Sequence, residues 1–319
     1  MRSAVTLLLI LALSSADHPV PAAERPKLRI VYVAPIGVMA PLWMAAASSA
    51  FQREGLEVDL LYIRPSAAIA AIIANEVDGV EISAPAVIPA VLAGANLTMI
   101  AGLLNRMIFS LHAQPDIKSA NQLRGKIVGT DRAGTPADYG GRTALTKIGL
   151  KPESDVHLLP LGGSAILWPA LQSRQIAAST LTPPQSFLAD ARGFTRLADT
   201  YDLPYQNVGI VIRKEDLEKR SAVWQKFLRA MRQGIRIWYE DPKSAVNVLS
   251  RYTQETDSEM LRKTYEFFSK QAGFNRDLAV SDRGIESILR FLGATVLPSA
   301  RGATASQFYD TRILDKIRP

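Results

Sequence analysis

The sequence predicts an α/β fold of two blocks, each a mostly parallel sheet flanked by helices, with extra helices at the C-terminus. Three observations support this prediction. Short apolar runs alternate with segments of helical spacing over residues 28–212, the connections between them are short, and from residue 214 onward the pattern is helical. Such alternation is typical of parallel sheets covered by helices. A chain of 319 residues has the length of about two domains.

The first block begins with a β-branched run at residues 28–33, which has the composition of a buried strand. A helix is expected from Pro41, because Trp43 and Phe51 belong to a series of apolar residues at helical spacing, and Gly55 ends it. The rest of the block continues the alternation. Further strands are expected at 58–63, 79–83 and 97–104, and further helices at 66–75 and 85–94.

The second block repeats this pattern and leads into a helical tail. Strands are expected at 126–129, 156–161, 176–181, 194–197 and 207–212, and helices at 136–147, 164–173 and 183–191. In the tail, an apolar stripe recurs at the spacing of a helix that packs against a core. It consists of Trp224, Phe227, Leu228, Met231, Ile235 and Trp238. Residues 285–292 carry a second stripe of the same kind.

The N-terminus has the pattern of a secretory signal peptide over residues 1–23. Arg2 supplies a positive charge, residues 4–13 are apolar, and small residues follow, with cleavage expected at Ala22 or Ala23. The apolar run is about half of the roughly 20 residues that a membrane-spanning helix requires. We therefore expect a periplasmic protein without stable membrane insertion, and an uncleaved N-terminal anchor is the alternative.

The composition and motifs exclude several classes of protein. The sequence contains no cysteine, which rules out disulfides, a thiol nucleophile, cysteine-based metal sites and a lipid anchor on cysteine. The net charge of +7 is spread along the chain without a basic run, so no nucleic-acid partner is expected. The nucleophile elbow, the phosphate-binding loop and the His-Glu-x-x-His motif are absent. We therefore expect no enzyme activity, no catalytic residue, no metal and no cofactor.

Small polar residues open several helices directly after a strand. They are Ser83, Thr135, Ser164 and Thr182. Pro136 follows Thr135 and Asp138 comes two residues later, which is a variant of the capping box. In an open parallel sheet these turns share the carboxyl edge, where free N–H groups and helix dipoles favour an anionic ligand. For each residue taken singly, the alternative is a helix cap without a ligand.

Four segments of the chain resemble periplasmic substrate-binding proteins of ABC importers, in the sulfonate, taurine and nitrate group that also includes relatives of the thiamine-pyrimidine-precursor synthase. They are residues 43–58, 73–80, 123–129 and 170–178, in the family's order and at its separations. The last segment departs from the family's usual Gly and Asp at Arg174 and Ala177. The resemblance extends over about residues 28–317.

This resemblance implies a two-lobed clamshell, similar to type II binding proteins. Lobe one would comprise residues 28–107 plus 207–319, and lobe two residues 108–206. A small, anionic organic solute, such as a sulfonate or a carboxylate, would bind between the lobes of a monomer. An inner-membrane ABC permease and its ATPase would be the partners. The alternatives are a periplasmic hydrolase or lyase, and a sensor module that serves no transporter, on the same fold.

Ligand contacts are expected from the turns at the carboxyl edges of both lobes. In lobe two, residues 130–138 would hold the anionic end through the helix start at Thr135 and the guanidinium of Arg132. Pairing of Arg132 with Asp131 at the surface is the alternative, and the ring of Trp43 is expected either against the ligand or in the core. The expected ligand-binding residues are Pro35, Gly37, Met39, Ser66, Ser83, Thr130, Arg132, Thr135, Ser164 and Thr182.

Overall fold

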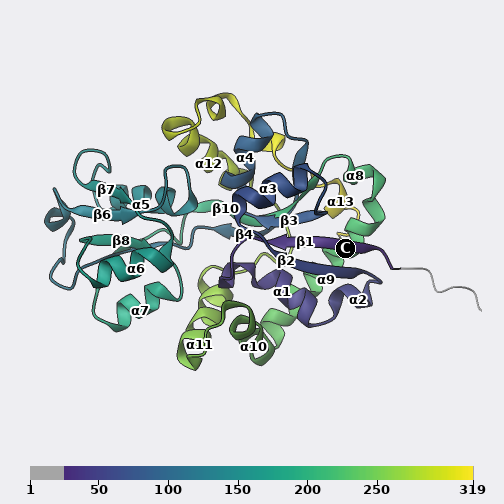
Figure 1. Ribbon diagram of the computed structural model, residues 1–319, viewed down its shortest axis with the longest axis horizontal. Helices are drawn as coiled ribbons and strands as arrows, with labels where there is room; N and C mark the ends of the chain where they lie inside the picture. Colours follow the sequence, from purple (N-terminus) through teal and green to yellow (C-terminus); the bar gives the residue numbers. More distant parts are fainter. Residues whose placement is uncertain (1–24, 319) are drawn as a thin grey trace, which may run out of the picture.

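Two five-stranded sheets covered by helices form two lobes that lie side by side in the computed structural model, which describes residues 25–318 (Figure 1). In lobe one the strand order is β2-β1-β3-β10-β4. These strands are β1 (Lys27–Tyr32), β2 (Glu57–Tyr62), β3 (Gly79–Ile82), β4 (Leu97–Arg106) and β10 (Pro204–Arg213). In lobe two the order is β7-β6-β8-β5-β9. These strands are β5 (Ser110–Ala113), β6 (Ile127–Thr130), β7 (His157–Pro160), β8 (Ala178–Leu181) and β9 (Thr195–Asp199).

Both sheets are mostly parallel, as predicted, and each contains one strand that runs against the others and makes the sheet mixed. Strands β1, β2 and β3 pair in parallel, whereas β10 runs antiparallel to β3 and β4. Lobe two repeats this arrangement, because β6 is parallel to β7 and β8 while β5 is antiparallel to β8 and β9. The antiparallel strands flank the two places where the chain passes between lobes, at residues 107–109 and 200–203.

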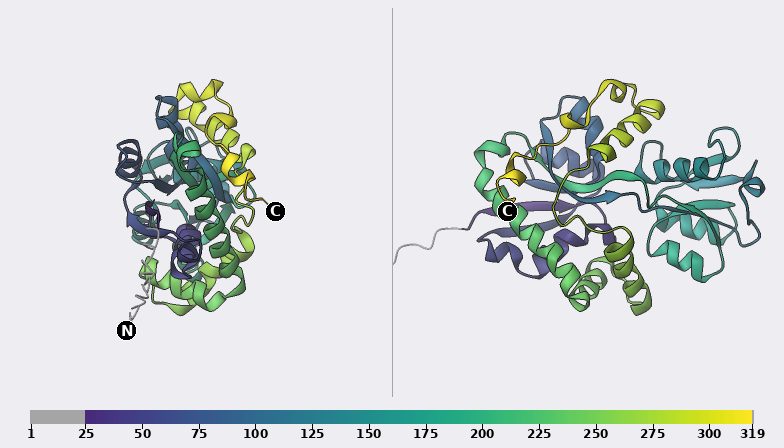
Figure 2. Two further views of the ribbon diagram at one scale, coloured as in Figure 1. Left: turned by 90° about the vertical axis from the view of Figure 1, so that its right-hand side faces the viewer. Right: turned by 180° about the vertical axis from the view of Figure 1, so that it is seen from behind.

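Most helices belong to lobe one, including all those that follow β10 (Figure 2). Lobe one carries α1 (Ala40–Ala47), α2 (Ala50–Arg53), α3 (Pro65–Ile73), α4 (Ala84–Leu92), α8 (Asp216–Lys219), α9 (Ser221–Glu240), α10 (Pro242–Thr253), α11 (Ser258–Glu266), α12 (Asp282–Thr295) and α13 (Arg312–Asp315). Lobe two carries α5 (Pro136–Lys147), α6 (Ser164–Gln172) and α7 (Gln185–Ala191). The helix expected over residues 41–55 is divided into α1 and α2, because Ser49 adopts a left-handed backbone conformation with φ of 59°.

The predicted apolar stripe of α9 lies in the core of lobe one, and all six of its residues are buried. Trp43 also belongs to this core: its side chain is fully buried and stacks on Tyr252 with ring centroids 4.7 Å apart. The core alternative for Trp43 is therefore the one that the structure shows. Burial of large aromatic rings at this interface fixes α1 and α10 against each other.

No helix among residues 25–318 combines the length and the apolar character that crossing a membrane requires. The predicted signal peptide, residues 1–23, lies outside the described residues.

Glu81, in the central strand β3, is fully buried, and neither of its carboxylate oxygens has a hydrogen-bond partner among the described residues. This burial raises the pKa of the Glu81 carboxyl well above its ordinary value of 4.5. Because the folded state then binds the proton more tightly than the unfolded state, the stability contributed by Glu81 is lost as the pH rises above the ordinary pKa.

We expect Glu81→Gln to stabilise the protein at neutral pH, because the amide has the shape of the protonated acid and carries no charge. The gain in unfolding free energy at pH 7 is at most about 3.4 kcal/mol, the free energy of protonating an ordinary glutamate at that pH. The stabilisation by Glu81→Gln should decrease as the pH falls toward 4.5. Urea denaturation of both proteins at pH 7 and pH 5 measures it, and an equal or lower stability of the variant at pH 7 contradicts the prediction.

Candidate ligand-binding site

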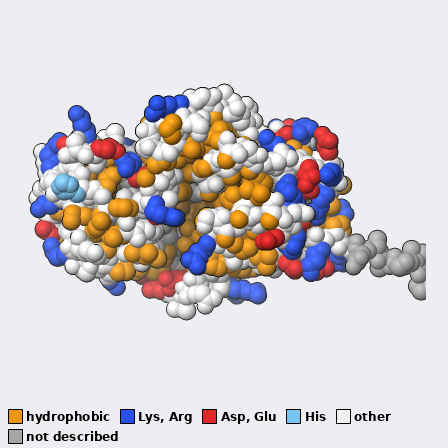
Figure 3. All heavy atoms as spheres, turned by 45° about the horizontal axis from the view of Figure 1, so that its top comes forward, with side chains coloured by type: hydrophobic (Ala, Val, Ile, Leu, Met, Phe, Trp, Pro, Cys, Tyr) orange, Lys and Arg blue, Asp and Glu red, His pale blue; other side chains and the backbone are white. Residues whose placement is uncertain are grey.

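A cavity of about 410 Å³ lies between the two lobes. Residues of both lobes and of the first crossing line it, and Figure 3 shows a furrow between the lobes bordered by hydrophobic side chains. The lining residues are Val33, Ala34, Ile36, Val38, Met39, Ser83, Ile108, Phe109, Asp131, Pro136, Ala137, Gly163, Ser164, Ala165, Ile166, Thr182, Gln185, Asn207 and Val208. A larger hollow of about 560 Å³ beside α12 is lined by lobe one alone and meets no carboxyl end of a strand.

The cavity forms where the expected turns meet. In lobe one, the turns after β1 and β3 reach it, and in lobe two those after β6, β7 and β8 do so. Carboxyl ends of strands are the usual place for ligands in open α/β sheets. Four of the expected site residues line the cavity: Met39, Ser83, Ser164 and Thr182.

The other expected residues lie elsewhere. Pro35 and Gly37 line a neighbouring cavity of about 130 Å³, together with Pro184 and Gln185 of lobe two. Ser66 is exposed on the first turn of α3, outside both cavities. The reason is that β2, which precedes Ser66, is the edge strand of its sheet, so its carboxyl end lies farthest from lobe two.

Thr130 and Thr135 support the loop between β6 and α5 without lining the cavity. Thr130 is 4% exposed, behind this loop. Thr135 is the N-cap of α5, as its sequence pattern predicts, and its Oγ1 accepts a hydrogen bond from the Asp138 N–H at 3.3 Å. Their neighbours Asp131, Pro136 and Ala137 are the residues of this loop that face the cavity.

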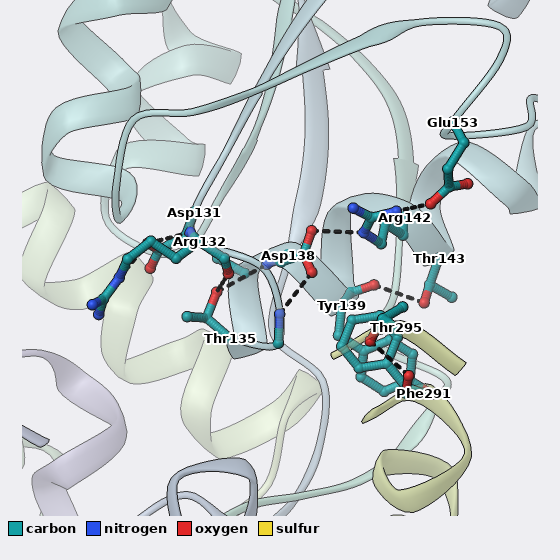
Figure 4. Close-up of polar contacts among 12 residues, drawn as sticks. Asp131, Arg132, Thr135, Asp138, Tyr139, Arg142, Thr143, Glu153, Phe291 and Thr295 are labelled. Carbon is teal, nitrogen blue, oxygen red and sulfur yellow. Dashed lines mark hydrogen bonds and ion pairs between the residues drawn. The ribbon is translucent and has the colours of Figure 1, made fainter. Parts of the chain in front are cut away.

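The start of α5 carries its own negative charge (Figure 4). The Asp138 carboxylate is buried, accepts a hydrogen bond from the Gly134 N–H at 2.9 Å and pairs with Arg142 Nε at 2.7 Å. A carboxylate in the first turn satisfies N–H groups there and offsets the positive end of the helix dipole. This helix start is therefore less suited to an anion than its sequence pattern alone indicates.

Arg132 points away from α5 (Figure 4), and its side chain is 87% exposed. Its Nε lies 3.9 Å from Asp131 Oδ1, which also accepts the Arg132 backbone N–H at 2.7 Å. Of the two alternatives for Arg132, the structure shows the surface pair with Asp131. The guanidinium does not reach the cavity in this arrangement.

The start of α6 offers a better cradle for a negative group. Its N-cap, Gly163, has no side-chain cap, and no acidic residue stands in its first turn. Gly163, Ser164 and Ala165 all face the cavity, where the first N–H groups of a helix have no partner within the helix. Beside them, Ser164 Oγ accepts the Thr182 N–H at 3.1 Å and lies 3.2 Å from Thr182 Oγ1.

Asp131 is the one charged residue among the described residues that line the cavity. The other polar side chains there are neutral, those of Ser83, Ser164, Thr182, Gln185 and Asn207. Most of the wall is apolar, with Ile36 from lobe one and Ile166 from lobe two each more than one-third exposed beside it. The cavity therefore fits a small organic molecule whose apolar part covers these side chains and whose polar end meets neutral donors.

Sequence reasoning did not select Asp131, Gln185 or Asn207. Gln185 opens α7, and Asn207 lies on β10, where its side-chain amide donates to the Arg106 carbonyl at 3.0 Å. Asn207 could have been selected from the sequence because it lies near the start of the strand with which the chain returns to lobe one, and residues near such a crossing border both lobes.

Two sheet lobes joined by two chain crossings, with a cavity between them, have the fold of two-lobed periplasmic binding proteins, and solved structures of such proteins share this fold. The periplasmic aliphatic sulphonate binding protein SsuA from Escherichia coli is 16% identical, with a TM-score of 0.72 over 86% of this chain and 87% of that chain. The periplasmic nitrate-binding protein NrtA from Synechocystis is 13% identical, with a TM-score of 0.67 over 92% and 86%.

A third similar structure is the alkanesulfonate-binding protein SsuA from Xanthomonas axonopodis, bound to MOPS. It is 15% identical, with a TM-score of 0.68 over 92% of this chain and 98% of that chain. No curated protein matches the sequence. The family model described as NMT1/THI5 like matches residues 37–245, more than half of the chain, and the protein belongs to this family.

Proposed function

We propose that this protein is the periplasmic solute-binding subunit of an ABC importer, and that it captures a small organic solute with an anionic end between its lobes. The observation that carries the proposal is the cavity of about 410 Å³ that is lined by residues of both lobes and by Ile108 and Phe109 of the first crossing. Membership of the NMT1/THI5-like family and the fold shared with sulfonate- and nitrate-binding proteins support it. An inner-membrane permease and its ATPase are the partners that this function requires.

The geometry favours one orientation of the solute. The anionic end would lie at the uncapped start of α6, near Ser164 and Thr182, and the apolar part would cover Ile36 and Ile166. Helix starts without an acidic residue stabilise negative groups through their N–H donors and dipole. Neutral donors and an apolar wall favour organic sulfonates or carboxylates over small inorganic anions, which offer no apolar surface to bury.

A cluster in lobe two resembles the polar residues of a hydrolase, but its position favours a structural role. His112 Nε2 lies 2.9 Å from Asp190 Oδ1, and Ser110 Oγ lies 3.5 Å from His112 Nδ1. Ser110 and His112 are fully buried in β5, and none of the three lines the cavity. A nucleophile must reach its substrate, so we infer a binding protein rather than a hydrolase.

A thermal-shift screen tests the proposed function. A ligand that binds only the folded state raises the unfolding temperature in proportion to its occupancy. The screen compares organic sulfonates, organic carboxylates, inorganic anions and neutral pyrimidines, and isothermal titration calorimetry follows each hit. We expect hits among the organic anions with one site per chain. Hits confined to neutral compounds would contradict the anionic part of the proposal, and a complete lack of hits would contradict the whole.

We expect Asp131→Asn to tighten the binding of an anionic hit about three- to tenfold at low salt, because it removes the negative charge from the cavity wall. The asparagine Oδ1 can still accept the Arg132 N–H, so the loop should keep its shape. The gain should diminish at high salt, and a neutral hit should show none. Calorimetric titrations of both proteins at two salt concentrations decide this, and weaker binding of the anion by the variant contradicts it.

A further inference from the structure

The last long helix of lobe one, α12, makes an aromatic contact with lobe two. The ring of Tyr139, on α5, stacks on Phe291 of α12 with centroids 4.4 Å apart and an interplanar angle of 15° (Figure 4). Tyr139 also packs against Tyr205 of β10 at 5.6 Å, and its hydroxyl hydrogen-bonds to Ser287 Oγ on α12. One residue of lobe two is thus held by three residues of lobe one.

The loop before α5 rests on the end of the same helix. A Cβ atom at Gly134 would lie 3.9 Å from the Cβ of Val296, and 2.7 Å from its Cγ2. Gly134 therefore lies directly on Val296, the C-cap of α12. Both ends of the segment 134–139 are supported by α12, and between them Pro136 and Ala137 line the ligand cavity.

Helix α12 itself is fixed to lobe one. Its residues Ile285, Ile288 and Leu292 are buried in the lobe-one core, and a Cβ atom at Gly284 would lie 2.5 Å from the Gln206 backbone nitrogen of β10. The helix and the returning strand thus form one unit. When the lobes move about the crossings, the contact between Tyr139 and α12 must open or slide, as must the contact of Phe187, on α7, with Phe267 of lobe one.

We propose that α12 positions the α5 wall of the cavity by docking Tyr139, and that this docking holds the cleft closed before any solute binds. This inference rests on the proposed function only in one respect, namely that the closed cleft serves to bind a solute. A cleft that the protein itself holds closed binds its solute more tightly. The reason is that less of the binding free energy is used to shift molecules from the open to the closed conformation. Tyr139 and Phe291 are positioning residues and do not line the cavity.

The absence of native cysteine allows a test without any ligand. Spin labels on Ser154→Cys in lobe two and Lys243→Cys in lobe one, both exposed positions, report the distance between lobes by double electron–electron resonance. The doubly labelled protein without any further substitution should show one narrow distribution of distances between the labels. Phe291→Ala, which removes the stacked ring, should add a longer-distance population of at least about 10%. Phe274→Ala is the matched control, because this ring belongs to the core of lobe one and the aromatic rings against which it packs, those of Trp238 and Phe268, belong to lobe one as well.

A second variant covers the case in which Phe291→Ala fails to fold. Val296 is 44% exposed, so Val296→Glu should leave the core intact while it places a carboxylate beside the loop that carries Asp131 and leads into the first turn of α5, where Asp138 lies. We expect the same longer-distance population. If neither folded variant lengthens the distance, or if the control lengthens it equally, the inference is wrong. Because no solute is present, such a result leaves the proposed function untouched, and a failed ligand screen leaves this measurement valid.

Discussion

Replacement of Gly163 by leucine should abolish solute binding in a protein that still folds. Gly163 faces the cavity, its φ of −76° suits any residue, and no atom lies within 4 Å of the place that a Cβ would occupy. The leucine side chain would therefore enter the cavity instead of clashing with the protein. We expect the affinity for any solute found by the screen to fall at least about a hundredfold, which corresponds to about 2.7 kcal/mol.

The matched control is Gly302→Leu, at a glycine that also has open space around its Cβ position but does not line the cavity. Calorimetry should show wild-type affinity for the control and no measurable heat for Gly163→Leu. Thermal unfolding should show a loss of about 1 kcal/mol for Gly163→Leu, since leucine is a poorer N-cap than glycine. Unchanged affinity in Gly163→Leu would remove this cavity as the binding site.

The same substitution at two helical glycines should have opposite effects on stability. A Cβ atom at Gly234, on α9, would lie 2.6 Å from the Ala45 backbone nitrogen of α1, so Gly234→Ala forces the two helices apart. At Gly141, on α5, the nearest atoms would lie at 3.5 Å, an ordinary contact distance. Overpacking against a core costs about 1–3 kcal/mol, whereas alanine in an unobstructed helix gains about 1 kcal/mol over glycine.

We therefore expect the unfolding free energies of Gly234→Ala and Gly141→Ala to differ by about 3 kcal/mol, with the Gly141 variant more stable than the wild type. Urea denaturation at neutral pH measures both. The contact between α9 and α1 supports the cavity as well, because the turn that contains Met39 leads directly into α1. Equal stabilities of the two variants would show that α1 and α9 are packed less closely than this structure describes.

The alternation of strands and helices was predictable because each element carries its own local signal. The run at 28–33 corresponds to β1, and the stripe from Trp224 to Trp238 corresponds to the buried face of α9. The prediction that the turns after the strands lie together at one edge of each sheet followed from topology alone, since the carboxyl ends of parallel strands meet on one side. That argument selected Ser83, Ser164 and Thr182, which lie in the wall of one cavity, and their contact with a ligand stays a prediction.

The details that escaped prediction depend on contacts between residues far apart in sequence. Tyr139 meets Ser287 across 148 positions, and no local pattern on α5 or α12 reveals that pair. The direction of Arg132 likewise depends on whether its side chain gains more from solvent or from the cavity, which spacing does not decide. Glu81 lies in a strand pattern where an acidic residue usually indicates a solvent-facing side, yet every residue of β3 is buried.

The central claim is that the chain binds a solute in its cleft and returns it unchanged. Its most direct test combines calorimetric titration of the strongest hit with mass spectrometry of the solute recovered after prolonged incubation. The account predicts one site per chain, recovery of chemically unchanged solute, and loss of both the heat and the bound solute in Gly163→Leu. Conversion of solute in excess of the protein, or binding that Gly163→Leu leaves intact, would contradict it.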